Sequence, residues 1–356
     1  MSLAVIGGTV VDIVLPRVPR LPVWPRHTES TLANLVLLRE PPIVTLGGNG
    51  ANAAYVAARC GTKVTLHTQL AADTTGELAR GWLERAGCRV VCARAQGTLA
   101  TKVSAKRVSG ARNAASKSAT AMNVTAANAR QQRAMFFFPG AAVEMQTFAD
   151  VLNGDEIGRR FLLVTGWPHP PLAEMAQGLR AARTREMFTA VDAGPILGRP
   201  WSLSALRPVF ASLDLFLTND YELCRIARTA TCEAAIAKLR LVYSGHLVIK
   251  RGGDGAQWIP KETSEVVSVG SRRVRVVNTV GAGDSFNGAL MAALDRGADF
   301  PRAMREACAT AASVVASKHG VLGVQPRSEH RVPAPAPTPN SSQPKTHSHE
   351  NLAGQC

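Results

Sequence analysis

A turn of small residues followed by an aspartate is the part of this sequence best suited to chemistry. Gly281, Ala282 and Gly283 precede Asp284, between an expected strand at Arg272–Val277 and an expected amphipathic helix. Residues this small let a ligand come close to the backbone, and the free N–H groups of a helix N-terminus favour an anion such as phosphate. A carboxylate would repel phosphate at that point, but it suits a general base that takes the proton of an attacking hydroxyl group. The residues alone also allow a simple glycine-rich turn in which Asp284 caps the helix.

A second glycine-rich stretch, from Gly48 to Ala53, lies between an expected strand and an expected helix. Its Gly48-x-Gly50-x-x-Ala53 spacing has the form of a dinucleotide fingerprint, with Asp73 near the place of the usual ribose ligand. The same stretch can instead line a substrate site, because the backbone at Gly48 is open and the amide of Asn52 offers a donor and an acceptor to hydroxyl groups. The residues alone leave both interpretations open.

Polar residues follow three further apolar runs, where they are candidates for ligand contacts. Asp12 comes shortly after the first expected strand, and Asn219 and Glu222 follow a later one. Lys250 opens a glycine-rich loop that ends at Gly255. A carboxylate and an amide after a buried strand suit a magnesium ion that keeps its waters and bridges phosphates. Taken one at a time, these patterns are also typical of ordinary turns and helix starts.

The elements that must position these residues alternate between short apolar runs and amphipathic segments. Continuous apolar runs are typical of strands buried on both faces, and their alternation with helices predicts a parallel sheet covered on both sides. Ligands in such sheets gather beyond the carboxyl ends of the strands, which is where the candidate residues stand. The expected strands are Leu3–Ile6, Lys63–Leu66, Phe161–Thr165, Phe188–Val191, Leu213–Thr218 and His246–Lys250.

At residues 278–286 the sequence resembles a signature of the ribokinase-like (pfkB-type) carbohydrate kinase family, Asp-Thr-x-Gly-Ala-Gly-Asp-x-Phe, from which only Asn278 departs. The stretch that begins at Gly47 resembles the family's other signature, and the resemblance runs from about residue 3 to about residue 326. It implies an α/β fold, a ribokinase-like three-layer sandwich with a mainly parallel central sheet and a small β lid. It also implies ATP-dependent phosphorylation of a hydroxyl group on a sugar or a related small molecule.

The resemblance assigns a role to each matching residue. It implies that Gly281, Ala282 and Gly283 form the anion hole for the γ-phosphate of ATP and that Asp284 is the catalytic base. The other implied contacts are Asp12, Gly48, Asn49 and Asn52 for the substrate, Lys250, Gly252 and Gly255 for the nucleotide, and Asn219 and Glu222 for Mg²⁺.

Two departures limit what the resemblance implies. The usual residue at position 278 often helps to hold a monovalent cation, so Asn278 leaves a potassium requirement open. Asn49 stands where ribokinases proper usually carry lysine, so ribose is not implied as the substrate.

Three stretches interrupt the rhythm of helices and strands. Residues 15–42 and about 99–138 are predicted to form a lid that excludes water from the substrate site. A mobile insertion is predicted within the lid, at about 104–133. The kinase domain is predicted to span residues 1–326 and to be followed by a disordered, proline-rich tail at 327–356.

Composition limits the other classes of function. The net charge is +15, but the basic residues are scattered and aromatic residues make up only 5%, so nucleic-acid binding is not expected. Without an apolar run of about 18 residues or a signal-peptide pattern, no membrane association is expected. Seven cysteines without a Cys-x-x-Cys pair suit a reducing compartment, so a cytoplasmic location is expected. The sequence leaves the oligomeric state open, with a homodimer among the options.

Two rival functions remain at this point. A dinucleotide-dependent oxidoreductase would bind a pyrophosphate at Gly48–Ala53 and would leave Asp284 without a role. A non-catalytic nucleotide-binding protein on the kinase scaffold would bind ATP without turnover.

Overall fold

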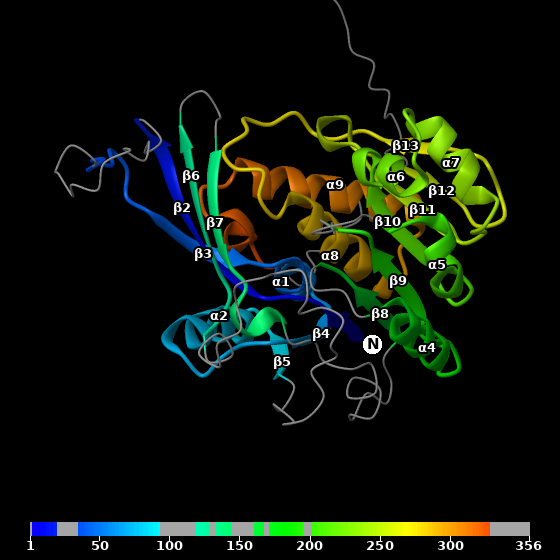
Figure 1. Ribbon diagram of the computed structural model, residues 1–356, viewed down its shortest axis with the longest axis horizontal. Helices are drawn as coiled ribbons and strands as arrows, with labels where there is room; N and C mark the ends of the chain where they lie inside the picture. The colour runs from blue at the N-terminus through cyan, green and yellow to red at the C-terminus, as the bar shows by residue number, and fades with distance from the viewer. Residues whose placement is uncertain are drawn as a thin grey trace, which may run out of the picture. The chain divides into compact units, whose positions relative to one another are not determined.

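The computed structural model describes residues 2–19, 35–92, 119–128, 133–143, 160–166, 171–194 and 201–327, and a nine-stranded sheet runs through them (Figure 1). The strand order is β13-β12-β11-β10-β9-β8-β1-β4-β5, and the strands from β11 across to β5 run parallel. β12 and β13 continue the sheet in antiparallel pairs. The strands are Ser2–Ile6 (β1), Lys63–Thr68 (β4), Cys88–Cys92 (β5), Phe161–Val164 (β8), Phe188–Asp192 (β9), Leu215–Asn219 (β10), His246–Lys250 (β11), Ala256–Ile259 (β12) and Val267–Val269 (β13).

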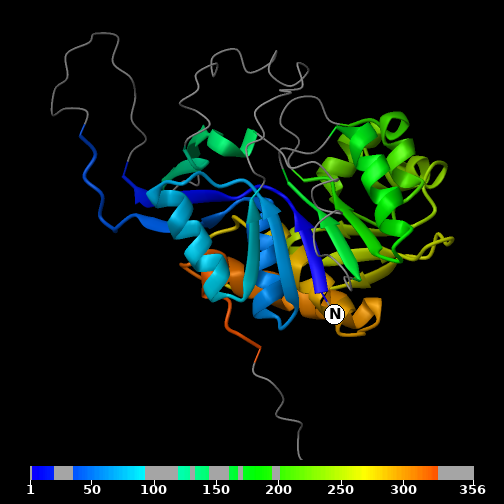
Figure 2. The same ribbon diagram turned by 90° about the horizontal axis from the view of Figure 1, so that it is seen from below.

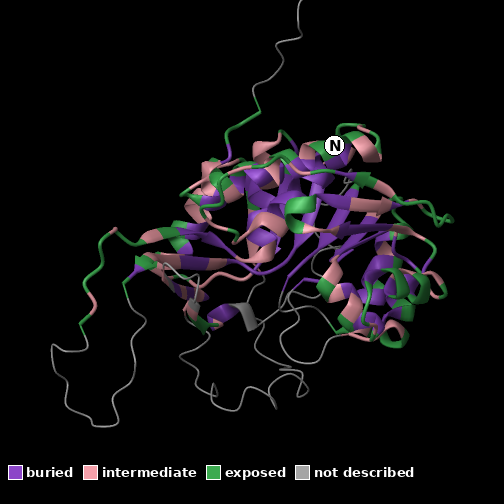
Figure 3. Ribbon diagram, turned by 90° about the horizontal axis from the view of Figure 1, so that it is seen from above, coloured by how far each residue is buried: buried purple, intermediate pink, exposed green. Residues whose placement is uncertain are grey.

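The central strands are buried on both faces, as their unbroken apolar runs predict. In β1, Leu3 and Val5 enter the core on one side of the sheet, whereas Ala4 and Ile6 enter the core on the other side. None of the four is more than 1% exposed. Figure 3 shows the strands of this sheet as a largely buried layer. The alternation of side chains along each strand therefore supplies two separate hydrophobic cores.

Helices cover both faces of the sheet and complete three layers (Figure 1). α1, α2, α8 and α9 bury side chains in one core, and α4, α5, α6 and α7 bury side chains in the other. The expected α/β three-layer sandwich is confirmed. The helices are Asn49–Arg59 (α1), Thr74–Arg85 (α2), Leu172–Arg183 (α4), Leu203–Phe210 (α5), Asp220–Ala227 (α6), Cys232–Arg240 (α7), Ala282–Asp295 (α8) and Phe300–Ala316 (α9). Among these described helices, none combines the length and the apolar character that crossing a bilayer requires.

A second, four-stranded sheet lies beside the central one in the described part of the chain, and Figure 2 shows β2 leading into it from β1. Its order is β3-β2-β6-β7. β2 pairs antiparallel with β3 and parallel with β6, and β6 pairs antiparallel with β7. The strands are Val10–Val18 (β2), Ile43–Gly47 (β3), Met122–Asn128 (β6) and Arg133–Phe138 (β7). The small β lid expected for the fold is confirmed.

The strands of the lid begin and end at other residues than expected. β2 starts at Val10, before the predicted stretch 15–42, and β3 starts at Ile43, after it. The predicted insertion at 104–133 is wrong where β6 occupies residues 122–128, while 104–118 and 129–132 lie outside the described residues. The buried positions of β6 include Asn123 and Thr125, and such polar alternation leaves no apolar period to detect. Residues 328–356 of the predicted tail are also outside the described part.

The basic, valine-rich segment Arg272–Val277 is not a strand, contrary to the expectation from sequence. The last strand of the sheet, β13, ends before it, and Val276 and Val277 are 62% and 46% exposed. The N–H groups of Val277 and Asn278 both donate to the carbonyl oxygen of Val315 in α9. The segment therefore docks on a helix, and without a partner strand its β propensity does not produce a ladder.

Close packing of α1 on α8 brings the main candidate residues together. A Cβ atom on Gly288 of α8 would lie 2.2 Å from the carbonyl oxygen of Ala53 in α1, so only glycine fits there. α1 carries Asn49 and Asn52, and α8 carries Asp284 in its first turn. The helix contact therefore fixes how far apart these three side chains lie.

Replacing Gly288 with alanine is expected to push α1 and α8 apart. Overpacking typically costs about 1–3 kcal/mol, so Gly288→Ala should lower the free energy of unfolding in urea by that amount. The matched control is Gly81→Ala in α2, where the added Cβ would meet only the far end of the flexible Arg85 side chain at 3.0 Å. Alanine should be neutral or stabilising at that helical position. Equal unfolding midpoints for the two variants would contradict the tight contact.

Candidate active site

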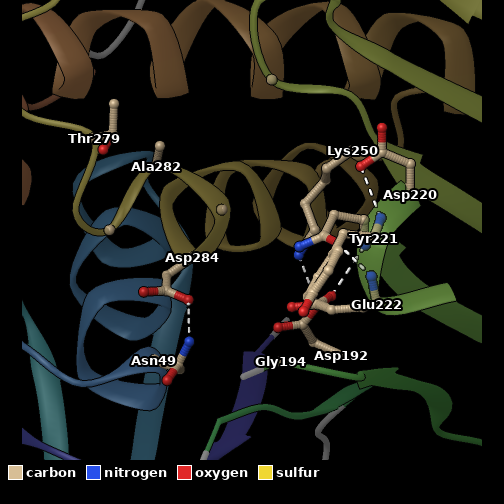
Figure 4. Close-up of a pocket in the computed structure, with 14 residues that line it drawn as sticks. Asn49, Asp192, Gly194, Asp220, Tyr221, Glu222, Lys250, Thr279, Ala282 and Asp284 are labelled. Atoms are coloured by element: carbon tan, nitrogen blue, oxygen red, sulfur yellow. Dashed lines mark hydrogen bonds and ion pairs between the residues drawn. The ribbon is translucent and has the colours of Figure 1, made fainter. Parts of the chain in front are cut away.

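A pocket of about 470 Å³ lies beyond the carboxyl ends of the parallel strands, where the sequence predicts a ligand site (Figure 4). Its walls come from the ends of β9, β10 and β11 and from the amino-terminal turns of α1, α6 and α8. The residues that line it are Asn49, Asp192, Gly194, Asn219, Asp220, Tyr221, Glu222, Lys250, Gly252, Thr279 and Gly281–Asp284.

The amino end of α8 opens onto this pocket. Gly281 precedes the helix with a φ of 77°, a left-handed conformation that glycine adopts without strain. No side chain among the described residues caps this helix end, so N–H groups of its first turn can bind an oxygen-rich ligand. A Cβ on Gly283 would lie 3.7 Å from Lys250 Nζ, which places an ammonium beside the turn. The turn from Gly281 to Gly283 therefore has the geometry of an anion site.

Asp284 points from α8 toward α1, where its carboxylate faces Asn49 (Figure 4). Two asparagines of α1 hold this carboxylate. Asn49 Nδ2 donates to Oδ1 at 2.7 Å, and Asn52 Nδ2 donates to Oδ2 at 3.0 Å. Asp284 is only 8% exposed. Gly281 occupies the cap position of the helix, so capping of α8 is not the role of Asp284.

The surroundings of Asp284 raise the pKa of its carboxyl group. Burial raises the pKa of Asp284, and the nearby carboxylate of Asp192 raises it further. The hydrogen bonds from Asn52 and Asn49 and the charge of Lys250 offset part of this rise in pKa. A base whose pKa lies closer to the working pH is better matched to proton abstraction.

A buried ion pair stands across the pocket from Asp284 (Figure 4). Lys250 Nζ, at the end of β11, donates to Asp192 Oδ1, at the end of β9, over 2.7 Å. Asp192 is 1% exposed, and its Oδ2 accepts from Thr165 Oγ1 at 3.1 Å. Burial alone would lower the pKa of Lys250, but the carboxylates of Asp192 and Glu222 raise it, so Lys250 carries its charge at neutral pH.

Sequence reasoning missed Asp192. It directly follows the expected strand Phe188–Val191, and an acidic residue at the carboxyl end of a buried parallel strand is the signal that identifies it.

Asn219 and Glu222 cap the start of α6 reciprocally. Asn219 Oδ1 accepts from the N–H of Glu222 at 2.7 Å, and Glu222 Oε2 accepts from the N–H of Asn219 at 3.0 Å. The helix-start interpretation is therefore correct as local structure, yet both residues also line the pocket. Burial raises the pKa of Glu222, and Asp192 raises it further, while Lys250 lowers it.

The oxygen atoms at this end of the pocket suit a magnesium ion. Asp220 and Glu222 contribute carboxylates and Asn219 an amide, and hard oxygen donors are those that Mg²⁺ prefers. No group of three His, Cys, Asp or Glu side chains in the described ranges is placed to hold a metal by itself. A magnesium ion here would take its remaining ligands from water and phosphate oxygens.

Asp12 extends the site toward the lid. It lies on β2, is 5% exposed, and its Oδ1 accepts from Asn123 Nδ2 of β6 at 3.1 Å. Burial raises the pKa of Asp12 to about 6, the bond from Asn123 lowers it, and the charge of Asp284 raises it. The carboxylate of Asp284 therefore lies near enough to affect the protonation of Asp12. Asn123 was missed because it falls in the stretch predicted as an insertion.

The predicted site residues fall into two groups. Those that line the pocket are Asn49, Asn219, Glu222, Lys250, Gly252 and Gly281–Asp284, and those that do not are Asp12, Gly48, Asn52 and Gly255. Both glycines of the second group are needed for packing. A Cβ on Gly48 would lie 2.5 Å from the carbonyl oxygen of Gly8, and one on Gly255 would lie 2.0 Å from that of Val269. The fold alone accounts for these two glycines.

Asp73, the ribose ligand of the oxidoreductase alternative, is engaged elsewhere. Its Oδ1 accepts from the N–H of Gly76 at 2.7 Å and from Thr120 Oγ1 at 2.6 Å, and its Oδ2 accepts from the N–H of Thr120 at 2.8 Å. Burial alone would raise the pKa of Asp73, but these bonds hold it below its usual value. The carboxylate ties α2 to the chain entering β6, which does not favour the dinucleotide interpretation.

Solved ribokinases share this architecture. A ribokinase from Arabidopsis thaliana, complexed with ribose and ATP, matches with a TM-score of 0.67 and 20% identity over 91% of this chain and 95% of that one. A ribokinase from Thermotoga maritima matches with a TM-score of 0.67 and 22% identity over 92% of this chain and 97% of that one. Likeness at such identities shows the fold, so this protein has the ribokinase-like fold.

The family follows from the sequence match. The model of the pfkB family carbohydrate kinases matches residues 42–326, and the chain therefore belongs to that family. A fructokinase from Rhizobium leguminosarum bv. trifolii is 27% identical over 164 residues, which cover 45% of this chain and 50% of the relative. The match thus spans about half the length of that curated relative.

The burial of Asp12, with a smaller contribution from the charge of Asp284, predicts a carboxyl group that titrates above the usual range. With a pKa of about 6 instead of 3.8, Asp12 should lose its proton between about pH 5 and pH 7. ¹³C NMR of protein labelled at aspartate Cγ should show this titration, and Asp12→Asn should remove it. Asn123→Ala should raise the pKa further, because it deletes a bond that favours the charged form. Finding every aspartate fully ionised by about pH 5 would contradict the assignment.

Proposed function

We propose that this protein transfers the γ-phosphoryl group of ATP to a hydroxyl group of a sugar or a related small molecule. The observation that carries the proposal is the placement of Asp284, a buried carboxylate held by Asn49 and Asn52 directly after the open turn that begins α8. A base next to an anion site is what phosphoryl transfer to a hydroxyl group needs. Membership of the pfkB family of carbohydrate kinases supports this function.

On the acceptor side, Asp12, Gly48, Asn49 and Asn52 are proposed to contact the substrate. Asp284 takes the proton of the reacting hydroxyl group as its oxygen attacks the γ-phosphorus. The new P–O bond forms as the bond from the γ-phosphorus to the bridging oxygen of ADP breaks, and Asp284 then releases the proton to solvent.

On the donor side, the N–H groups at the start of α8 are proposed to bind the γ-phosphate. These groups are fixed by the helix before the reaction, so they stabilise charge on the transferring group without reorganising. The proposed donor-side residues are Gly281, Ala282 and Gly283 for the γ-phosphate, Lys250, Gly252 and Gly255 for the nucleotide, and Asn219 and Glu222 for Mg²⁺. Magnesium, when bound, would neutralise phosphate charge. The Arabidopsis ribokinase solved with ribose and ATP supports ATP as the donor.

The surroundings of the site follow the same proposal. The small β sheet is proposed to cover the acceptor and to keep water from competing with it. A cytoplasmic location is proposed, supported by Cys88, Cys232 and Cys308, which are buried and form no disulfide. A homodimer remains a prediction, favoured by the exposed apolar side chains at Met135–Phe138.

The second candidate function is a nucleotide-binding protein without turnover. The departure at Asn278 motivates it, although Asn278 Oδ1 accepts from the N–H of Val280 at 3.0 Å and so keeps the turn in order. The two candidates differ in whether Asp284 moves a proton.

Asp284→Asn is expected to reduce phosphoryl transfer about a hundred- to ten-thousand-fold, the usual worth of a general base. Asparagine keeps the size of the side chain and an oxygen that can accept from Asn49, so folding and ATP affinity should change little. Coupled-assay rates and ATP titration calorimetry on the same preparation measure both quantities.

The control for this variant is Asp299→Asn at the start of α9. Asp299 accepts from the N–H of Arg302 at 2.8 Å, and asparagine caps a helix about as well, so turnover should be unchanged. Full turnover in Asp284→Asn would overturn the proposed mechanism, and a wild-type protein that binds ATP without turnover would favour the second candidate.

Glu222→Gln is expected to weaken magnesium binding, because it removes charge beside the proposed ion while its amide oxygen can still accept from the N–H of Asn219. Loss of a group that acts on a metal through its ligands typically costs about 10–100-fold in affinity. The magnesium concentration for half-maximal rate should rise by that factor, whereas Glu233→Gln in α7 should leave it unchanged. An unmoved magnesium titration would reduce Glu222 to a helix-capping role.

A further inference from the structure

Lys250 is the one cationic side chain among the described residues that line the pocket. The same lining contains the carboxylates of Asp192, Asp220, Glu222 and Asp284 (Figure 4). A buried ion pair is poor evidence for stability, because a well-packed apolar pair in its place is often as stable or more so. The position of Lys250 within the pocket is therefore more informative than its pairing.

The ammonium of Lys250 lies beside the first turn of α8. Its Nζ donates to Asn287 Oδ1 of that helix at 3.4 Å, and a Cβ on Gly283 would be 3.7 Å away. An ammonium has three N–H donors, and Asp192 and Asn287 take two of them. The third donor can reach a ligand oxygen held by the turn, which is where the transferring phosphoryl group is proposed to sit.

Asp192 holds the ammonium in this place. Its carboxylate is almost fully buried, and Thr165 Oγ1 fixes the oxygen that does not contact Lys250. The side chain of Lys250 is thus fixed at both ends, by strand β11 at the backbone and by Asp192 at the ammonium. A charge fixed in advance beside the reacting group costs no reorganisation when charge develops there.

We propose that Lys250 is a catalytic residue whose ammonium donates to an oxygen of the transferring phosphoryl group, with Asp192 as the positioning residue that holds it. The inference rests on the proposed kinase function and goes beyond a general role of Lys250 in nucleotide binding. It assigns to Lys250 a contact that strengthens in the transition state, so its loss lowers kcat and leaves the KM of the acceptor nearly unchanged.

Three variants test the inference. Lys250→Met removes the ammonium but leaves Asp192 buried without it, so lost stability could be mistaken for lost catalysis. The double variant Lys250→Met/Asp192→Asn removes both charges and should unfold at a temperature near that of the wild type. Lys238→Met in α7 removes an ammonium away from the pocket and is the matched control. Each protein is assayed for turnover, for ADP affinity, and for ADP affinity in the presence of aluminium fluoride, a mimic of the phosphoryl group in transfer.

Because Lys250 is proposed to contact the nucleotide through the transferring phosphoryl group, which ADP lacks, the double variant should bind ADP as the wild type does. It should lose about a hundred- to a thousand-fold in kcat and a similar factor in the affinity gained from aluminium fluoride. Lys238→Met should match the wild type throughout. Recovery of turnover to within about tenfold of the wild type in the double variant would show that Lys250 and Asp192 only join two strands. An unchanged gain from aluminium fluoride in the double variant would overturn the inference in the same way.

Failure of the proposed function gives a different result. A wild-type protein without transfer to any acceptor would refute the kinase proposal, and the aluminium fluoride measurement would still decide the role of Lys250. A wild-type protein that gains no affinity from aluminium fluoride would refute the inference itself.

Discussion

The whole site depends on how closely helix α1 lies against helix α8 and strand β1. A Cβ on Gly288 would fall within 3 Å of the backbone of Ala53 in α1, and one on Gly50 would fall within 3 Å of the backbone of Gly7, directly after β1. These contacts set the amino ends of α1 and α8 side by side, so that Asn49 reaches the carboxylate of Asp284. Without that approach, the turn before α8 would be an anion site with no base held beside it.

Charge is the second constraint on the pocket. Carboxylates outnumber ammonium groups in its described lining, and a triphosphate adds more negative charge. The N–H groups at the start of α8 and Lys250 supply positive potential, and the proposed magnesium ion would add to it. A nucleotide and its cation are therefore expected to enter as a pair.

The fold and most of the pocket lining could be predicted from the sequence because they depend on local patterns. Unbroken apolar runs such as Leu3–Ile6 predict buried strands, and the turn of small residues before Asp284 predicts an anion site at a helix start. Asn123 was missed because it falls in the stretch predicted as an insertion. Asp192 follows an expected strand, but its contact with Lys250 of β11 joins residues that are distant in sequence. Arg272–Val277 misled for the same reason, since its pattern is that of a strand but its neighbour is a helix.

The hydrogen bonds between Asp73 and Thr120 fix the chain that enters strand β6, and this tie affects how the lid could move. Thr120 is three residues from Asn123 and eight from Asn128, so a stiff strand β6 turning about this tie would move Asn128 through the longer arc. The bond from Asn123 to Asp12 lies near the pivot and is displaced least. A rotation of the whole lid about this tie would therefore displace the polar contacts at its base less than its tip.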